Sequence, residues 1–216
     1  MKTMKVKITL LESMLGTAPA DADVYRNYIG GNAPDASSLE EEIAAIGVDE
    51  VANKGRTVFP RLDDGTPFLY DYQIKGFFKD ACGMLNRLTK KEETVDENGK
   101  VKKSKKTSTE SGKLKAYKKE IDGLIFVEPR KIPIVFDGEV GDCQRPLRAQ
   151  TMQGERVTLA SSDEVPAGAT MTFTIALMND EHEAAVREWL DYGRWRGLGQ
   201  WRNSGKGRFS WEEAGN

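Results

Sequence analysis

Residues 197–209 read GLGQWRNSGKGRF, and this glycine-rich stretch near the end of the chain organises the interpretation of the whole sequence. It holds four glycines, two arginines, a lysine and a tryptophan, and it joins a helical segment to a short strand-like end at residues 208–211. Glycine lets a backbone take positive φ and approach a partner closely, and exposed backbone N–H groups beside cations bind anions. The stretch is therefore either a tight connection whose tryptophan packs on the core or a functional, anion-binding loop.

The composition describes one rather polar domain without a global charge signature. The chain has 216 residues, of which 38% are hydrophobic and 31% charged, and its formal net charge is −2. This length suits a single domain, with the excess polarity placed in insertions. A nucleic-acid site would therefore have to arise from local segregation of charge.

The two cysteines and the first residues of the sequence indicate the cellular compartment of the protein. Cys82 and Cys143 are far apart in the sequence, and the first residues lead into an alternating strand pattern instead of an apolar signal region. No apolar run approaches the length of a membrane span. We expect a cytoplasmic protein with reduced thiols and no membrane partner.

Six segments carry the strongest secondary-structure patterns of alternation or helical spacing. In chain order they predict a strand at 5–11, a helix at 74–88, strands at 121–127 and 170–177, a helix at 180–191 and a strand at 207–212. The order β-α-β-β-α-β predicts an α+β, ferredoxin-like (RRM-like) core, with residues 1–216 forming one domain that contains long insertions. In this layout the glycine-rich stretch connects the second helix to the last strand.

Residues 89–120 differ in character from the rest of the chain. Eleven lysines lie between Lys90 and Lys119, and Tyr117 is the one aromatic residue there. Asn98-Gly99 between β-prone residues is a weak hairpin signature. We expect a protruding, lysine-rich hairpin or flexible arm, which is either simply solvated or used to grip a phosphate backbone.

Further basic residues occur at the start of the first predicted helix and in an extended run. Lys75 and Lys79 flank Gly76 within what the pattern predicts as the first turns of the helix, where cations oppose the helix dipole. They form either a solvated face or a phosphate site. Arg145 and Arg148 add two cations to an extended-looking segment.

Three features resemble the RAMP superfamily of CRISPR-associated RNA-binding proteins. GLG at 197–199 with GKGRF at 205–209 is similar to the family's glycine-rich loop, and IKGFFK at 74–79 is similar to its helix-opening segment. The basic insertion lies where backbone subunits of the family carry a protruding hairpin. The resemblance implies a ferredoxin-like core and a role with RNA in antiviral defence, or a stand-alone or phage-borne relative of such subunits.

The resemblance and the local charge together predict a non-catalytic, backbone-type subunit. It would hold single-stranded, crRNA-like RNA through its phosphates, with other subunits of a ribonucleoprotein or copies of itself as further partners. Trp201 either stacks on a base or fills the core beside the loop. The residues expected to contact RNA are Lys75, Gly76, Lys79, Arg145, Arg148, Gly199, Trp201, Arg202, Gly205, Lys206, Gly207 and Arg208.

No catalytic residue, metal site or cofactor is expected. His182 is the one histidine, and its acidic neighbours indicate an exposed surface position. Asp21, Asp23 and Asp35 lie in the broad region where metal-dependent RAMP relatives carry a loop aspartate, but nothing singles one of them out. Two alternatives remain open: a protein–protein module, such as a CRISPR mimic or inhibitor or a phage assembly scaffold, and a RAMP-type endoribonuclease.

Overall fold

The computed structural model describes residues 1–20, 56–88, 90–95, 101–106, 109–151 and 154–215, with the backbone alone for 90–106 and 147–159 within these ranges. The aspartates considered as metal ligands, Asp21, Asp23 and Asp35, lie outside the described residues, as does the side chain of Arg148.

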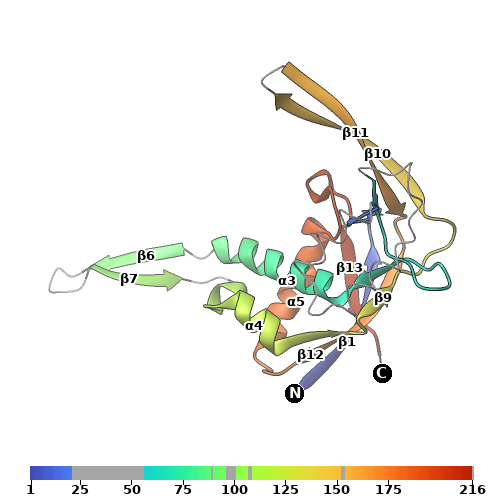
Figure 1. The fold of residues 1–216 in the computed structure, drawn as a ribbon. Helices are drawn as coiled ribbons and strands as arrows, with labels where there is room; N and C mark the ends of the chain where they lie inside the picture. Colours follow the sequence, from blue (N-terminus) through green and yellow to red (C-terminus); the bar gives the residue numbers. More distant parts are fainter. Residues whose placement is uncertain (21–55, 89, 96–100, 107–108, 152–153, 216) are drawn as a thin grey trace.

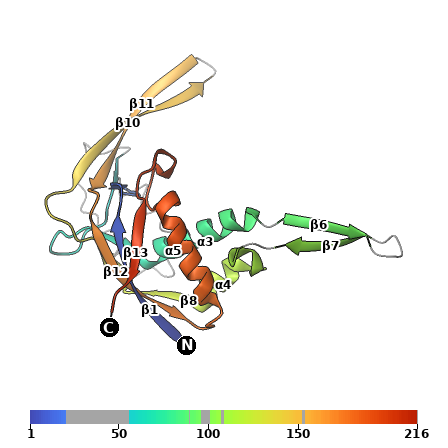
Figure 2. The ribbon, with the colours of Figure 1, turned by 180° about the vertical axis from the view of Figure 1, so that it is seen from behind.

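A four-stranded antiparallel sheet forms the centre of the protein (Figure 1). Its spatial order is β13 (Phe209–Glu213), β1 (Lys2–Leu10), β12 (Thr170–Leu177) and β8 (Ile125–Glu128). Helices α3 (Asp71–Leu85) and α5 (His182–Arg196) lie against one face of this sheet (Figure 2). The α+β prediction is confirmed, and these elements follow one another in the chain order β-α-β-β-α-β.

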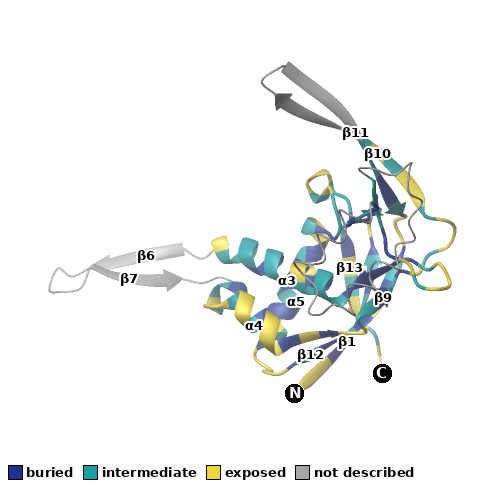
Figure 3. Cartoon of the chain, in the orientation of Figure 1, coloured by how far each residue is buried: buried dark blue, intermediate teal, exposed yellow. Residues whose placement is uncertain are grey.

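The core lies between the sheet and the two helices, and Figure 3 shows the buried residues gathered there. Alternate residues of β1, such as Val6 and Ile8, are fully buried, because successive side chains of a strand point to opposite faces. Apolar residues of α3 at helical spacing meet them from the other side. Phe78 packs against Trp189 of α5 at 5.5 Å between ring centroids.

The predicted bounds of most elements differ from the structure by two or three residues, and two differences are larger. Residues 117–124 form a helix, α4 (Tyr117–Leu124), and the strand expected at 121–127 begins only at Ile125. A short apolar run has the same pattern in a buried strand and on the inner face of a helix. Periodicity alone therefore could not place the boundary between α4 and β8. Helix α5 continues to Arg196 and ends at Gly197, whose φ of +73° stops the helix.

Two hairpins project from the body (Figure 1). One consists of β6 (Lys90–Val95) and β7 (Val101–Lys106), and the other of β10 (Gly141–Thr151) and β11 (Gly154–Val165). The arm expected at 89–120 therefore contains a hairpin at 90–106, after which the chain returns to the body through η2 (Ser111–Lys113) and α4. Among the helices described, none is long and apolar enough to cross a membrane.

Short strands complete the framework. The base of β11 pairs with β2 (Met14–Leu15) and β4 (Thr57–Val58), and β4 pairs with β3 (Ala18–Pro19). A separate ladder joins β5 (Phe68–Tyr70) to β9 (Lys131–Pro133), and the single turn η1 (Asn86–Leu88) follows α3. The segment after β1 is thereby fixed to the base of the β10–β11 hairpin.

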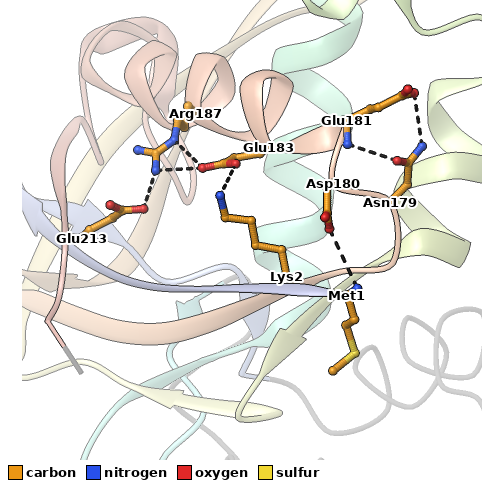
Figure 4. A network of polar contacts seen from close by, with 8 residues as sticks. All are labelled: Met1, Lys2, Asn179, Asp180, Glu181, Glu183, Arg187 and Glu213. Atoms are coloured by element: carbon orange, nitrogen blue, oxygen red, sulfur yellow. Dashed lines mark hydrogen bonds and ion pairs between the residues drawn. The ribbon is translucent and has the colours of Figure 1, made fainter.

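Ion pairs tie the start of α5 to the two neighbouring strands (Figure 4). The Lys2 ammonium lies 2.5 Å from a Glu183 carboxylate oxygen, and Arg187 donates to both Glu183 and Glu213. These groups are partly exposed to solvent, so each pair adds little stability. Their effect is to fix the first turns of α5 against the ends of β1 and β13.

Candidate nucleic-acid interface

The glycine loop, defined here as residues 197–208, connects α5 to β13 and is closed by backbone hydrogen bonds. Leu198 N donates to Gly207 O at 2.8 Å, which brings the two ends of the loop together. Gly207 N donates to Ser13 O at 2.8 Å, and Leu11 N donates to Arg208 O at 2.7 Å. The loop therefore lies directly on the segment that follows β1.

Several glycines are required by this close packing. At Gly199, with φ of +78°, a Cβ would lie 2.7 Å from the Leu15 carbonyl oxygen, and at Gly207, with φ of +71°, it would overlap the Leu198 carbonyl oxygen. Both positions combine a left-handed backbone with a contact that leaves no room for a side chain. These residues, expected from the sequence to contact RNA, shape the loop.

The outer half of the loop presents its backbone N–H groups. Gly197, Gly199 and Trp201 have positive φ, and Trp201, with ψ of 33°, lies in the left-handed helical region. Within the described part of the chain, the N–H groups of residues 199–203 form no hydrogen bond. The same residues, together with Arg196, line a pocket of about 320 Å³. The outer half of the loop therefore offers backbone donors to an acceptor other than the described residues.

Trp201 projects from this loop instead of packing into the core. Its side chain is 44% exposed, so the interpretation in which it fills the core is wrong. The guanidinium carbon of Arg145 lies 5.5 Å from the centroid of the Trp201 ring system. Arg145 is held there by a 2.7 Å hydrogen bond to Gln200 Oε1 and a longer one to Ser162 Oγ. The predicted residues Arg145 and Trp201 are thus brought together.

Two cations of the loop are neutralised by carboxylates of the protein. Arg202 Nη1 and Arg196 Nε each lie 2.8 Å from Asp80 Oδ2 on α3. Lys206 Nζ lies 2.5 Å from Glu164 Oε1 at the base of β11 and 2.6 Å from the Ser13 hydroxyl. These contacts fix the loop to the body on both sides.

Arg145 and Arg208 are different, because no described carboxylate lies within ion-pair distance of either guanidinium. Arg208 Nε is buried and has no hydrogen-bond partner among the described residues. A guanidinium without a counter-charge attracts an anion, which at Arg208 would have to approach the Nη atoms because Nε is buried. Among the described residues, the positive charge that no carboxylate neutralises at the loop therefore comes from Arg208 and from Arg145 of β10, which lies over Trp201.

Lys75, Gly76 and Lys79 lie apart from the loop's contacts. Lys79 Nζ is 2.5 Å from Asp122 of α4, and Lys75 donates to the Asp122 carbonyl oxygen and lies over the Phe126 ring. Because α3 begins at Asp71, Lys75 lies beyond the first turn, where backbone N–H groups are already bonded within the helix. The structure does not bring these residues together with the glycine loop.

His182 is buried, which corrects the expectation of an exposed histidine. Its side chain is 3% exposed, and Nε2 lies 3.0 Å from Glu120 Oε2. The expectation rested on the acidic neighbours of His182 in the sequence, which do not reveal that the first residue of α5 lies against Glu120 of α4. Across the described residues, no group of three or more His, Cys, Asp or Glu side chains is arranged to hold a metal ion.

Asp80 and Glu164 belong to the site but were missed by sequence reasoning. Asp80 reaches arginines 116 and 122 positions away, and Glu164 reaches a lysine 42 positions away. The spacing of residues along the sequence does not predict such pairs. The one available signal was the excess of cations in the loop, which required counter-charges from somewhere in the fold.

Asp80→Asn is expected to destabilise the protein at neutral pH and much less in acid. Although burial, the largest single influence, raises the pKa of the Asp80 carboxyl, Arg196 and Arg202 together hold it below its ordinary value. A carboxyl group whose pKa is lowered on folding stabilises the fold at pH values above its unfolded-state pKa, which is near 4. This stabilisation is lost as the pH falls through the pKa of the folded state.

Thermal unfolding at pH 7, 5, 4 and 3 checks this expectation. At pH 7 the melting temperature of the variant should lie about 2–4 °C below that of the wild type, the shift that about 1 kcal/mol produces in a domain of this size. The difference in melting temperature between the variant and the wild type should narrow as the pH falls from 4 to 3. Glu212→Gln, an exposed residue beside Lys7, is the matched control and should show little difference at any pH. A difference that stays the same from pH 7 to pH 3 would contradict a role for the Asp80 charge.

Neither a protein-family model nor a curated protein matches the sequence. Among solved structures, the chain is similar to a chain of the type III-B Cmr-beta bound to cognate target RNA, with 12% identity and a TM-score of 0.49. That likeness covers 98% of this chain and 60% of the other, so this chain spans about 60% of the length of that subunit. It is also similar to a chain of a type IV-B CRISPR complex, with 12% identity and a TM-score of 0.47, covering 100% and 91% of the two chains. At these scores neither likeness assigns a function to the chain.

Proposed function

We propose that the protein binds single-stranded RNA through its phosphates at the glycine loop, as a non-catalytic subunit of a CRISPR-type ribonucleoprotein. One observation carries the proposal: the N–H groups of residues 199–203 lack acceptors among the described residues and lie beside Arg145 and Arg208, to which no described carboxylate is paired. A phosphate group supplies both the acceptor oxygens and the negative charge that such a site lacks. The assignment to a CRISPR-type particle follows the motif resemblance at 197–209 and 74–79.

The ion pairs of the loop indicate different roles for the cations in and beside it. Arg145 and Arg208 would contact phosphates directly, whereas Arg202 and Lys206 hold the loop in shape through Asp80 and Glu164. Lys75, Gly76, Lys79 and Arg148 are proposed as secondary contacts along the path of a longer strand. The lysine-rich β6–β7 hairpin would close over that strand.

Removing Arg145 and Arg208, the two arginines without a described carboxylate partner, tests the proposal. Fluorescence anisotropy with an unstructured oligoribonucleotide should show salt-dependent binding by the wild type. The Arg145→Ala/Arg208→Ala variant should bind more weakly, and its slope of log K against log salt should be shallower by about 1.4, since each phosphate contact contributes about 0.7 on single strands. Lys5→Ala/Lys7→Ala, which removes the same charge from the exposed or half-buried positions of β1, is the matched control.

The possible outcomes distinguish the candidate functions. A wild-type protein that fails to bind RNA at low salt contradicts the proposal and favours the protein–protein module. An unchanged salt slope in the double variant would place the RNA elsewhere on the surface. Cleavage that His182→Ala abolishes would favour the endoribonuclease, although the buried contact of His182 with Glu120 argues against that role.

A further inference from the structure

The backbone conformation of Trp201 requires an explanation. It is the one non-glycine residue with positive φ in the described part of the chain, at φ 53° and ψ 33°. Such a conformation is strained for a bulky residue, and glycine would adopt it without strain. Strain of this kind persists where the surroundings enforce it, and it is concentrated at ligand-binding sites.

Packing does not account for tryptophan at this position. Its side chain is 44% exposed and takes no part in the buried core cluster. Gly199 and Gly205, on either side, already adopt left-handed conformations. A large aromatic ring is thus held out from the loop at a position where glycine would suit the backbone better.

The ring is held against a fixed cation. Arg145, half-buried on β10, lies over it and is anchored by Gln200 Oε1 at 2.7 Å and by Ser162. Ser162 is itself fully buried and hydrogen-bonded to Thr57. An anchored guanidinium on an aromatic ring orders the ring before any ligand arrives.

The surroundings of the ring suit a polar, flat ligand. Trp201 and Gln200 share the pocket of about 320 Å³ with Arg196, Arg202 and Asn203, so amide and guanidinium groups line its wall. Beyond the N–H groups that bond Asp80, the guanidinium and amide donors of these residues match the acceptors at the edge of a nucleobase.

We propose that Trp201 is a stacking platform for one unpaired nucleobase, which lies in this pocket while the flanking phosphate reaches Arg145. The inference rests on the proposed function for RNA as the ligand and adds that the loop recognises a base. A base paired within a duplex cannot reach the indole, so the platform selects single-stranded RNA. Every base has a π face, and the platform is therefore tolerant of sequence.

Two oligomers separate base recognition from phosphate binding. One is an unstructured oligoribonucleotide, and the other is an abasic ribose–phosphate oligomer of the same length and charge. Trp201→Gly is the informative variant, because glycine relieves the backbone strain while it removes the ring. Affinity for the base-bearing oligomer should fall by about 5- to 150-fold, the range of measured base–aromatic stacking effects, with an unchanged salt slope. Affinity for the abasic oligomer should not change.

Matched variants exclude a structural explanation. Trp201→Phe should retain most of the affinity, and Trp195→Ala, which removes a more exposed tryptophan from α5, should retain all of it. Thermal unfolding of Trp201→Gly should show equal or greater stability than the wild type, whereas a structural tryptophan would give a loss. If the wild type binds both oligomers and Trp201→Gly shows no selective loss of affinity for the base-bearing oligomer, the stacking platform is overturned. The proposed phosphate site would be unaffected by that result. Wild-type binding of neither oligomer overturns the proposed function itself.

Discussion

Replacing Gly207 with alanine is expected to lower the free energy of unfolding by about 3 kcal/mol or more, with loss of RNA binding. The added Cβ would overlap the Leu198 carbonyl oxygen, a backbone atom that no rotamer change can move, and φ is +71°. The loop would have to open. That movement would break the hydrogen bonds from Leu198 N to Gly207 O and from Gly207 N to Ser13 O. Urea unfolding followed by circular dichroism measures the loss.

Gly76→Ala is the matched control for this substitution. Gly76 lies in α3 with nothing within 4 Å of the position of a Cβ, so alanine should raise the free energy of unfolding by about 0.5–1 kcal/mol. Equal effects of the two substitutions would show that the close approach at Gly207 is unimportant. A loss of RNA affinity in Gly76→Ala with no loss of stability would place the RNA near α3.

Replacing Glu188 with alanine is expected to lower the free energy of unfolding by about 3 kcal/mol. The Glu188 carboxylate accepts hydrogen bonds from the backbone N–H groups of Glu110 and Ser111 and from the Ser111 hydroxyl, at 2.9, 2.9 and 2.6 Å. Ser111 is fully buried, and each buried polar group left without a partner costs about 1–3 kcal/mol. The Trp189 indole N–H still reaches the Ser111 hydroxyl in the variant, which limits the loss.

This contact also joins α5 to the segment through which the β6–β7 hairpin returns to the body. Glu188→Ala should therefore increase the rate of limited proteolysis around residues 109–113, in addition to its effect on urea unfolding. Glu181→Ala, whose described contacts are with Asn179, is the control from the start of the same helix. A double-mutant cycle with Ser111→Ala should give a coupling energy well above zero, and additive effects would contradict the direct contact.

The elements with clear periodicity could be predicted from the sequence. Strand β12 occupies 170–177 as expected, since its side chains alternate between a buried and a less buried face. The apolar residues of α3 recur at helical spacing, and Ile74, Phe77 and Phe78 are all buried. Where local pattern and tertiary burial agree, sequence determines both the element and its inner face.

What the sequence could not supply depends on contacts between distant segments. The strand predicted at 121–127 overlaps the end of helix α4. The acidic sequence neighbours of His182 indicated an exposed position, whereas its burial depends on Glu120 of α4, which is distant in the sequence. In the candidate site, the sequence indicated the glycine loop, Arg145 and Trp201. It could not show that Asp80 and Glu164 neutralise Arg202 and Lys206, nor that Lys75 and Lys79 turn toward Asp122. Charge counts along a chain do not reveal which cations already have partners in the folded state.

The position of β1 in the middle of the sheet has a consequence for synthesis on the ribosome. Both of its neighbours, β12 and β13, come from the last quarter of the chain, beginning with the pair Lys2 and Leu177. At about 5–20 residues per second, β1 waits roughly 10–35 s for its first partner strand to be translated. During that interval Val6 and Ile8, fully buried in the finished protein, have no sheet to join. The sheet can therefore form only after β12 and β13 have both been translated, and until then the apolar side chains of the nascent β1 lack the partners that bury them.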